Sequence, residues 1–211
     1  TDVVRRSVEW TVSMQNRDGG WAAFDVNNDK TFINDIPFSD MDSLCDPSSP
    51  DVTGRVLEAL GLLNDPRYHD VCARGVAYLR RTQEVEGSWF GRWGVNYIYG
   101  TSNVLCALSH QRVSAEDPMV MRGLDWLKSV QNVDGGWGEK LESYADKELM
   151  GRGPSTASQT AWAVMGLLAY RPAHDRAVQA GIRWLASRQL KNGVLDGTWD
   201  EREFTGTGFP N

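Results

Sequence analysis

The sequence has no long apolar run and no excess of positive charge, and each absence excludes a class of protein. No stretch of about 18 or more apolar residues occurs, so we expect no membrane-spanning helix. The 211 residues include 22 Lys and Arg against 28 Asp and Glu, a formal net charge of −6. A chain of this charge repels a phosphate backbone, so nucleic acid is not an expected partner.

Cysteine and histidine are scarce, with three of each, and they are widely spaced. Cys45, Cys72 and Cys106 are interpreted as ordinary thiols in a reducing compartment, because an odd and scattered set does not suggest a disulfide framework. A zinc site needs Cys, His and carboxylate ligands at short, regular spacings. The sequence has no such cluster, so we expect no metal site.

One pattern is present in four copies, and it is the most informative feature of the chain. Each copy has a pair of basic or small residues, an aromatic residue, a glutamine, a glycine and a tryptophan. The aromatic residue precedes the glutamine by five positions in all four copies, which indicates a repeat architecture. The copies are Arg5, Arg6, Trp10, Gln15, Gly19, Trp21; Arg74, Gly75, Tyr78, Gln83, Gly87, Trp89; Arg122, Gly123, Trp126, Gln131, Gly135, Trp137; and Ala180, Gly181, Trp184, Gln189, Gly197, Trp199.

Two kinds of helix are expected in each repeat. Apolar positions at helical spacing predict an amphipathic helix over 119–130, which the two glycines at 135–136 end. More apolar helices, of the kind that is buried on most sides, are expected over 51–63, 97–109 and 158–170. This alternation favours an all-α fold with an inner and an outer layer, an α/α toroid forming part of an α6/α6 barrel over residues 1–211. An open α-solenoid is the alternative.

The glutamine and the tryptophan of each copy are expected to have a structural role. A glutamine amide can satisfy backbone groups that a helix end leaves without partners. An indole ring buries a large apolar area. We therefore assign these eight residues to the scaffold and look for chemistry elsewhere.

Three segments, together with the repeats, resemble the squalene–hopene cyclase family. They are QNRDGGWAAFD at 15–25, GSWFGRWGVNYIYGT at 87–101 and FTGTGFP at 204–210. The resemblance covers essentially the whole chain and corresponds to the carboxy-terminal part of that enzyme, short of its final segment.

The resemblance implies a prokaryotic enzyme of two α/α barrels that works without cofactor or metal. Its activity would be the cyclisation of squalene to hopene and hopanol by proton-initiated carbocation chemistry. The implied partners are squalene or a similar polyprenyl substrate and the membrane surface, with a homodimer left open. The implied location is the cytoplasmic side of the membrane, as a peripheral or monotopic protein.

Two elements of the family pattern are missing from this sequence. The family's proton donor lies in an Asp-x-Asp-Asp motif just upstream of the position of Thr1, and Asp40 and Asp42 supply only part of such a motif. The aromatic-rich tail after Gly-Phe-Pro is missing as well. We therefore expect the chain to be a portion of a longer cyclase and to be inactive alone.

Asp51, Arg55 and Tyr99 are the candidate catalytic residues. Protonating an alkene needs a strong neutral acid, and a nearby cation strengthens an acid by stabilising its conjugate base. Arg55 is our candidate cation, oriented by Asp51 four residues earlier on the same helix face. An ordinary ion pair at a helix start would explain the same two residues. The resemblance favours the catalytic role, and some members have histidine in place of Arg55. It also assigns Tyr99 to the polar network that reprotonates the acid.

Five further residues match family positions that bind or admit the substrate. Aromatic faces stabilise a carbocation without reacting with it, and Phe24, Trp93 and Phe209 match positions that line the cavity. Phe24 replaces a tyrosine that is frequent there. Phe38 and Ser39 match the constriction through which squalene enters, and Ser39 replaces a cysteine of some members. Core packing for the aromatics and a plain turn after Pro37 are the alternatives.

Two other functions are consistent with the same residues. One is a cyclase of the same fold that acts on a different polyprenyl chain, because the cavity aromatics decide substrate length. The other is a non-catalytic α/α toroid used as a binding scaffold, which a protein without the Asp-x-Asp-Asp motif would suggest.

Overall fold

The structure is a computed structural model that describes residues 2–30, 45–191, 197–201, 203 and 205–206. The described residues form helices and loops, without a strand. The α-helices are α1 (Asp2–Ser13), α2 (Pro50–Leu63), α3 (His69–Thr82), α4 (Tyr97–His110), α5 (Pro118–Ser129), α6 (Ala157–Leu168) and α7 (Arg176–Arg188). Short 3-10 helices are η3 (Pro66–Tyr68), η4 (Leu141–Tyr144) and η5 (Lys147–Leu149).

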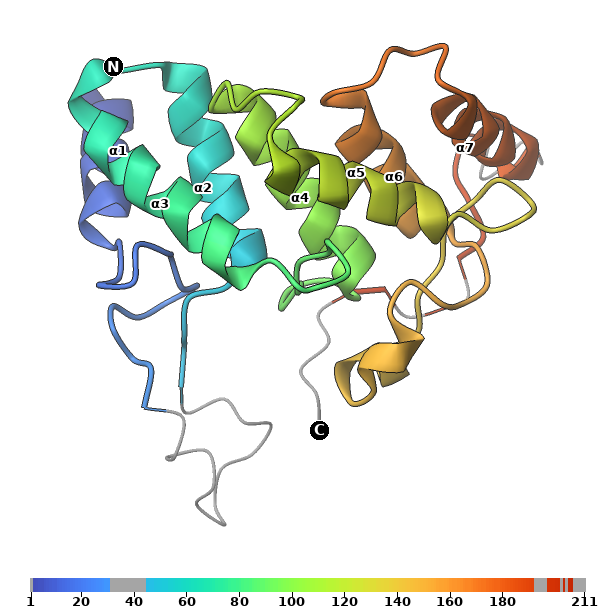
Figure 1. The fold of residues 1–211 in the computed structure, drawn as a ribbon, viewed down its shortest axis with the longest axis horizontal. Coiled ribbons are helices and arrows are strands. Elements are labelled where there is room, and N and C mark those ends of the chain that lie inside the picture. Colours follow the sequence, from blue (N-terminus) through green and yellow to red (C-terminus); the bar gives the residue numbers. More distant parts are fainter. Residues whose placement is uncertain (1, 31–44, 192–196, 202, 204, 207–211) are drawn as a thin grey trace.

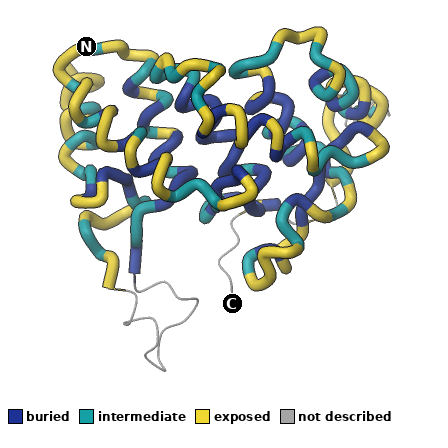
Figure 2. Tube along the Cα trace, viewed as in Figure 1, coloured by how far each residue is buried: buried dark blue, intermediate teal, exposed yellow. Residues whose placement is uncertain are grey.

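The helices form two layers that curve around a shared core (Figure 1). Helices α2, α4 and α6 pack side by side as the inner layer, and α3, α5 and α7 each pack on one of them. Burial follows the same division, because dark blue segments concentrate on the inner helices (Figure 2). All but 3 of the 14 residues of α4 are buried, whereas α1 has none. The prediction of an all-α fold with buried and half-exposed helices is confirmed.

The four glutamines make corresponding hydrogen bonds at the ends of the outer helices. Gln15 donates from Nε2 to the carbonyl oxygen of Gly19, and likewise to that of Val71 in the next outer helix, both at 2.9 Å. Gln83 bonds Gly87 and Met119 in the same way, and Gln131 bonds Gly135 and Ala177. These three glutamines therefore join one repeat to the next, as expected of an amide at a helix end, whereas Gln189 makes the corresponding bond within its own copy, to Gly197 at 3.1 Å.

The tryptophans fix the same junction through their indole rings. The indole Nε1 of each donates to a carbonyl oxygen of the preceding outer segment, Thr11, Leu79, Leu127 or Leu185. The ring then fills a gap on the next outer helix where that helix has a glycine. A Cβ atom on Gly123 would lie 2.8 Å from the ring of Trp89, and one on Gly181 would lie 2.8 Å from Trp137. We call the glutamine, the tryptophan and this facing glycine the repeat junction.

The glycine before each tryptophan has a backbone conformation that other residues rarely adopt. Its φ is +89° at Gly19, +105° at Gly87, +93° at Gly135 and +84° at Gly197. A side chain at Gly87 would also collide with the backbone of Arg122 on the next outer helix. The positive φ explains this glycine in all four copies, and the close backbone of the next outer helix adds a second constraint at Gly19 and Gly87.

Neighbouring outer helices are also linked by ion pairs at their ends. Asp117 and Asp175 cap the first turns of α5 and α7 by accepting the backbone N–H groups two residues later. Each aspartate also pairs with a cation of the preceding outer helix, Arg80 at 2.8 Å and Lys128 at 2.7 Å. These hydrogen bonds to a cation hold the pKa of both carboxyl groups below its usual range.

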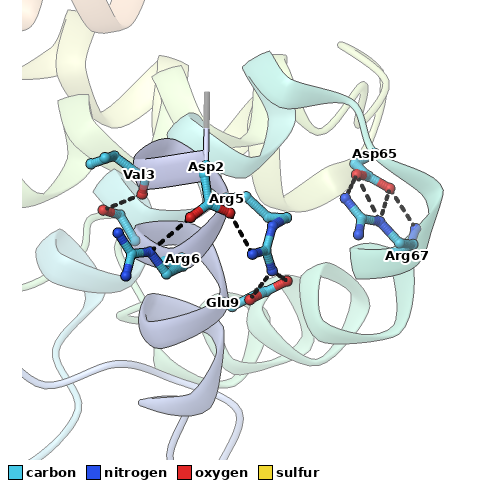
Figure 3. A network of polar contacts seen from close by, with 8 residues as sticks. Asp2, Val3, Arg5, Arg6, Glu9, Asp65 and Arg67 are labelled. Atoms are coloured by element: carbon cyan, nitrogen blue, oxygen red, sulfur yellow. Dashed lines mark hydrogen bonds and ion pairs between the residues drawn. The ribbon is translucent and has the colours of Figure 1, made fainter.

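Helix α1 differs from the other outer helices because none of its residues is buried. Arg5 bonds Asp2 and Glu9 on the same helix, and a separate pair joins Asp65 to Arg67 (Figure 3). Trp10, the aromatic residue of the first copy, is 63% exposed. Its counterparts Tyr78, Trp126 and Trp184 are buried.

The three cysteines lie inside the scaffold. Cys45, Cys72 and Cys106 are buried and free, and burial raises the pKa of Cys106 to about 11. Within the part of the chain that the structure describes, no helix has the length and apolar character to cross a membrane.

Candidate functional site

The inner helices begin at the lower side of Figure 1, and the described candidate residues Asp51 and Tyr99 lie in the first turns of α2 and α4. Each inner helix has a buried threonine in its first turns whose hydroxyl accepts the backbone N–H of a repeat tryptophan at 2.9 Å. These threonines are Thr53, Thr101 and Thr160. Two residues before them stand Asp51, Tyr99 and Ser158, so two of the three candidate catalytic residues, Asp51 and Tyr99, occupy equivalent positions in neighbouring repeats.

Asp51 is a buried carboxyl group in the first turn of α2, with an exposed fraction of 1%. The hydroxyl of Ser49 donates to Oδ1 at 2.5 Å, and the backbone N–H of Trp93 donates to Oδ2 at 2.8 Å. The helix N-terminus also favours negative charge at this position. The carboxyl group is therefore held in one orientation by a neighbouring side chain and by a loop of the next repeat.

The rings of Phe24 and Trp93 lie together, and the backbone of Trp93 contacts this carboxyl group. Their ring centroids are 5.5 Å apart in an edge-to-face arrangement. Asp46 holds the turn that carries Phe24, because its carboxylate accepts the backbone N–H groups of Ala23, Phe24 and Asp25. Phe24 is 70% exposed, so its ring is available to a ligand or to another part of a longer protein.

Tyr99 contacts the same loop that carries Trp93. Its ring lies against Gly91 and Gly94, where a Cβ atom would approach Cδ1 to 2.9 and 2.8 Å. On its other side the ring meets Trp162 of α6, with centroids 4.8 Å apart. The structure thus brings Asp51, Trp93, Phe24 and Tyr99 into one connected group.

Arg55 does not form the ion pair with Asp51 that its spacing predicts. Its guanidinium bonds Glu58 on the same helix at 3.0 Å, and the side chain is 43% exposed. Spacings of three and four residues both place side chains on one helix face. Asp51 is bonded instead by Ser49 and by the backbone of Trp93, and the cation pairs with the carboxylate of Glu58. The expectation that Asp51 orients Arg55 is wrong, whereas a role for Arg55 beside an acid elsewhere stays a prediction.

Phe38, Ser39 and Phe209 lie outside the described residues. The predicted substrate channel and the third cavity aromatic therefore stay predictions. No group of three or more His, Cys, Asp or Glu side chains suited to a metal occurs among the residues with a described position.

A buried polar group around Glu139 was not singled out from the sequence. Glu139 is 2% exposed, and Oε2 accepts the backbone N–H groups of Asn96 and Ile98 at the start of α4. Burial raises the pKa of Glu139. Burial and nearby carboxylates, Asp51 first among them, raise the pKa of Tyr144, whose hydroxyl therefore keeps its proton and donates. The available signal was an acidic residue two positions after Trp137, where the first two copies have Ala23 and Gly91 and the fourth has Glu201.

The arrangement is suited to cation chemistry on an apolar ligand. It combines an ordered buried carboxyl group with aromatic rings, whose faces stabilise positive charge without supplying a nucleophile. A carboxyl group that is held by donors on both oxygens can orient a polar network beside such a ligand.

A family model described as the squalene-hopene cyclase C-terminal domain matches residues 1–211. A probable squalene–hopene cyclase of Sinorhizobium fredii is 48% identical over 209 residues, covering 98% of this chain and 32% of the relative. A dammaradiene synthase of the plant Dryopteris crassirhizoma is 46% identical over 230 residues, covering 98% of this chain and 33% of the relative. The chain thus spans about a third of the length of these curated relatives.

A solved structure shares the fold at lower sequence identity. It is a type II terpene cyclase from Scytonema in complex with geranylgeranyl dihydroxybenzoate, with a TM-score of 0.64 and 22% identity. The match covers 95% of this chain and 52% of that protein. This likeness favours the α/α toroid predicted from the repeats over an open solenoid.

Proposed function

Because this chain belongs to the squalene–hopene cyclase family, we propose that the whole protein cyclises squalene to hopene and hopanol. The observation that carries this proposal is the family match over all 211 residues, which includes the site end of the inner helices. The chain is the C-terminal portion of that enzyme, and alone it is inactive because the acid lies in a preceding segment.

The reaction begins with proton transfer from the upstream acid to a terminal alkene of squalene. Each new carbon–carbon bond moves the positive charge to the next alkene, and the faces of Phe24 and Trp93 stabilise it. Loss of a proton ends the reaction as hopene, whereas capture of water and then loss of a proton gives hopanol. Tyr99 belongs to the polar network that returns a proton to the acid, and Arg55 supplies positive charge near that acid. Asp51 is the buried carboxyl group of the same site, held by Ser49 and by the backbone of Trp93.

The geometry that supports these roles is the connected group at the start of α2 and α4. Asp51 is buried and accepts the backbone N–H of Trp93, and Trp93 lies edge-to-face with Phe24. Phe38 and Ser39 form the entry constriction and Phe209 completes the aromatic lining in this proposal, on the strength of the family resemblance alone.

The test is product analysis of the full-length protein. Incubation with squalene, followed by gas chromatography and mass spectrometry, is expected to yield hopene and hopanol. This 211-residue chain, purified alone, is expected to leave squalene unchanged. A full-length protein that consumes no squalene, although its upstream sequence contains Asp-x-Asp-Asp, would contradict the proposal.

A second candidate is a cyclase with another substrate or product. It is favoured by the relatives themselves, since one is named a dammaradiene synthase and the Scytonema cyclase binds a geranylgeranyl substrate. The same assay decides, with geranylgeranyl compounds offered beside squalene. A scaffold without activity is the outcome if no polyprenyl substrate is consumed.

Peripheral attachment to the cytoplasmic side of a membrane, a bacterial origin and a homodimer are further parts of the proposal. They rest on the resemblance, and the relatives include fungal and plant proteins as well as bacterial ones. Flotation of the full-length protein with phospholipid vesicles tests attachment, and sedimentation in detergent tests the oligomeric state. Protein that stays at the bottom of the gradient would contradict membrane attachment.

A further inference from the structure

The 90–96 loop, which joins Trp89 to α4, carries one candidate site residue and supports another. Trp93 is part of the loop, and the ring of Tyr99 rests on Gly91 and Gly94. On one side the loop is tied to α2, because the backbone N–H of Trp93 donates to Asp51 at 2.8 Å. The position of this loop therefore sets how Trp93, Tyr99 and Asp51 lie relative to one another.

The other side of the loop is tied to a single buried carboxyl group. Oε2 of Glu139 accepts the backbone N–H of Ile98 at 2.9 Å and that of Asn96 at 3.3 Å. Asn96 is the N-cap residue of α4, and its own side chain makes no capping bond. Glu139 supplies the missing acceptor from a different repeat, at a helix end where a carboxylate is favoured.

Three more side chains brace the same loop from the segment after Glu139 and from α6. The hydroxyl of Tyr144 lies 2.8 Å from the carbonyl oxygen of Gly91 and 3.0 Å from that of Gly94. The amide of Asn96 bonds Ser143 through Nδ2, and its Oδ1 accepts the backbone N–H of Gly91. Gln159, fully buried, donates to the carbonyl oxygens of both Val95 and Glu139.

The loop has no room in which to shift without moving Tyr99. A Cβ atom at Gly94 would stand 2.8 Å from the Tyr99 ring, and one at Gly91 would collide with the backbone of Asn96. A close-packed interior transmits such displacements rather than absorbing them. A change at Glu139 is therefore felt at Tyr99 and at the Trp93–Asp51 hydrogen bond.

We propose that Glu139 is a positioning residue of the cyclase, which fixes the 90–96 loop and through it the orientation of Trp93, Tyr99 and Asp51 around the reacting chain. The inference rests on the proposed function. Glu139 touches no substrate in this account, and it acts through the backbone of the loop. Cyclisation in several steps needs the chain held in one fold, so a loosened loop releases the cation early as incompletely cyclised products.

The test compares three variants of the full-length protein. Glu139→Leu keeps the volume and removes both accepted hydrogen bonds, whereas Glu139→Gln retains a side-chain oxygen that can accept them. Gln131→Leu is the matched control, because it also removes two side-chain bonds to backbone but lies in a repeat junction away from the loop. Tyr144→Phe loosens the loop more gently and serves if Glu139→Leu does not fold.

Two readouts are taken well below each melting temperature. For Glu139→Leu we expect kcat to fall by about tenfold or more, with a larger share of partly cyclised products. Amide hydrogen exchange of Asn96 and Ile98 is expected to accelerate by about tenfold. Glu139→Gln restores most of both properties, and Gln131→Leu lowers the melting temperature while leaving product ratio and loop exchange as in the wild type.

The outcomes separate this inference from the proposed function. The positioning role of Glu139 is overturned if Glu139→Leu leaves the product ratio and the amide exchange of the loop unchanged. It is also overturned if Gln131→Leu shifts both to the same extent. If the wild-type protein does not cyclise squalene, the proposed function fails, while amide exchange still decides whether Glu139 fixes the loop.

Discussion

The repeat junctions keep the same residues from copy to copy, whereas the starts of the inner helices carry different residues at equivalent positions. At the junctions the residues recur. In each copy the glutamine amide donates to the carbonyl oxygen of the glycine, as Gln15 does to Gly19, and the indole of the tryptophan donates to a backbone carbonyl oxygen, as Trp21 does to Thr11. At the inner helix starts the equivalent positions hold three different residues, Asp51, Tyr99 and Ser158. What recurs holds the helices together, and the candidates for chemistry lie where the repeats diverge.

The largest expected effect is on activity, at a position that does not recur. Asp51→Asn in the full-length protein is expected to lower cyclisation by roughly a thousandfold or more, the scale of losing a group on which the chemistry depends. Its fold should persist, because the amide still accepts at Oδ1. Turnover of squalene and a thermal melt measure the two properties.

Ser158 of α6 occupies the position equivalent to Asp51 of α2, so a substitution of Ser158 is the control. Ser158 bonds Glu201 and Thr205 and has no assigned role, so Ser158→Ala is expected to keep activity near that of the wild type. Near-normal turnover by Asp51→Asn, or equal losses in both variants, would break the distinction between the two regions.

The largest expected effect on stability is at a junction tryptophan. Trp21→Ala and Trp137→Ala each remove a buried ring and an indole hydrogen bond, so each is expected to lower the free energy of unfolding by about 3–5 kcal/mol. Trp199→Ala should cost less, because that ring is 37% exposed. Urea denaturation measures all three, and an unchanged midpoint for Trp21→Ala would count against the structural role.

Substitution of a junction glutamine is expected to lower the free energy of unfolding less than loss of a tryptophan, and again less in the last copy than in the third. Gln131→Leu leaves the carbonyl oxygens of Gly135 and Ala177 without their donor, which costs about 1–3 kcal/mol. Gln189→Leu, in the copy whose glutamine bonds Gly197 at 3.1 Å, is expected to cost about half as much or less. Equal shifts in urea midpoint would show that the last junction is as tightly held as the third.

The smallest effect is expected at the ion pairs between outer helices, and it depends on pH. Arg80 lowers the folded pKa of Asp117 below its ordinary 3.8, so the stabilisation is present above that value and is lost as pH falls through the folded pKa. Arg80 is half exposed, and solvent screening limits the contribution to about 1 kcal/mol or less. The stability difference between wild type and Asp117→Asn should therefore shrink below pH 3.8; a constant difference down to pH 2 would contradict it.

Helical periodicity was sufficient to predict the inner helices because their burial is nearly complete. The predicted ranges 97–109 and 51–63 match α4 and α2 to within one residue at each end. The junction bonds follow from the same regularity, since a glutamine at a fixed step from an aromatic residue meets the same backbone in each copy. The threonines that accept the tryptophan N–H groups recur too, and their polar side chains in apolar helices were the overlooked signal.

The loops could not be predicted in the same way because they depend on contacts between repeats. Glu139 reaches the N–H of Asn96 across 43 positions of sequence, and no local spacing indicates that contact. Arg55 had two carboxylates at helical spacing and pairs with Glu58, while Asp51 accepts the Trp93 backbone N–H of another repeat, which no local spacing indicates. Local patterns define the helices, whereas the site depends on which loops meet.

The most direct test is the reaction of the full-length protein with squalene, analysed by mass spectrometry beside its Asp51→Asn variant. We expect hopene and hopanol from the wild type and unchanged squalene from the variant. Unreacted squalene in both samples, from a folded protein that contains Asp-x-Asp-Asp upstream, would contradict it.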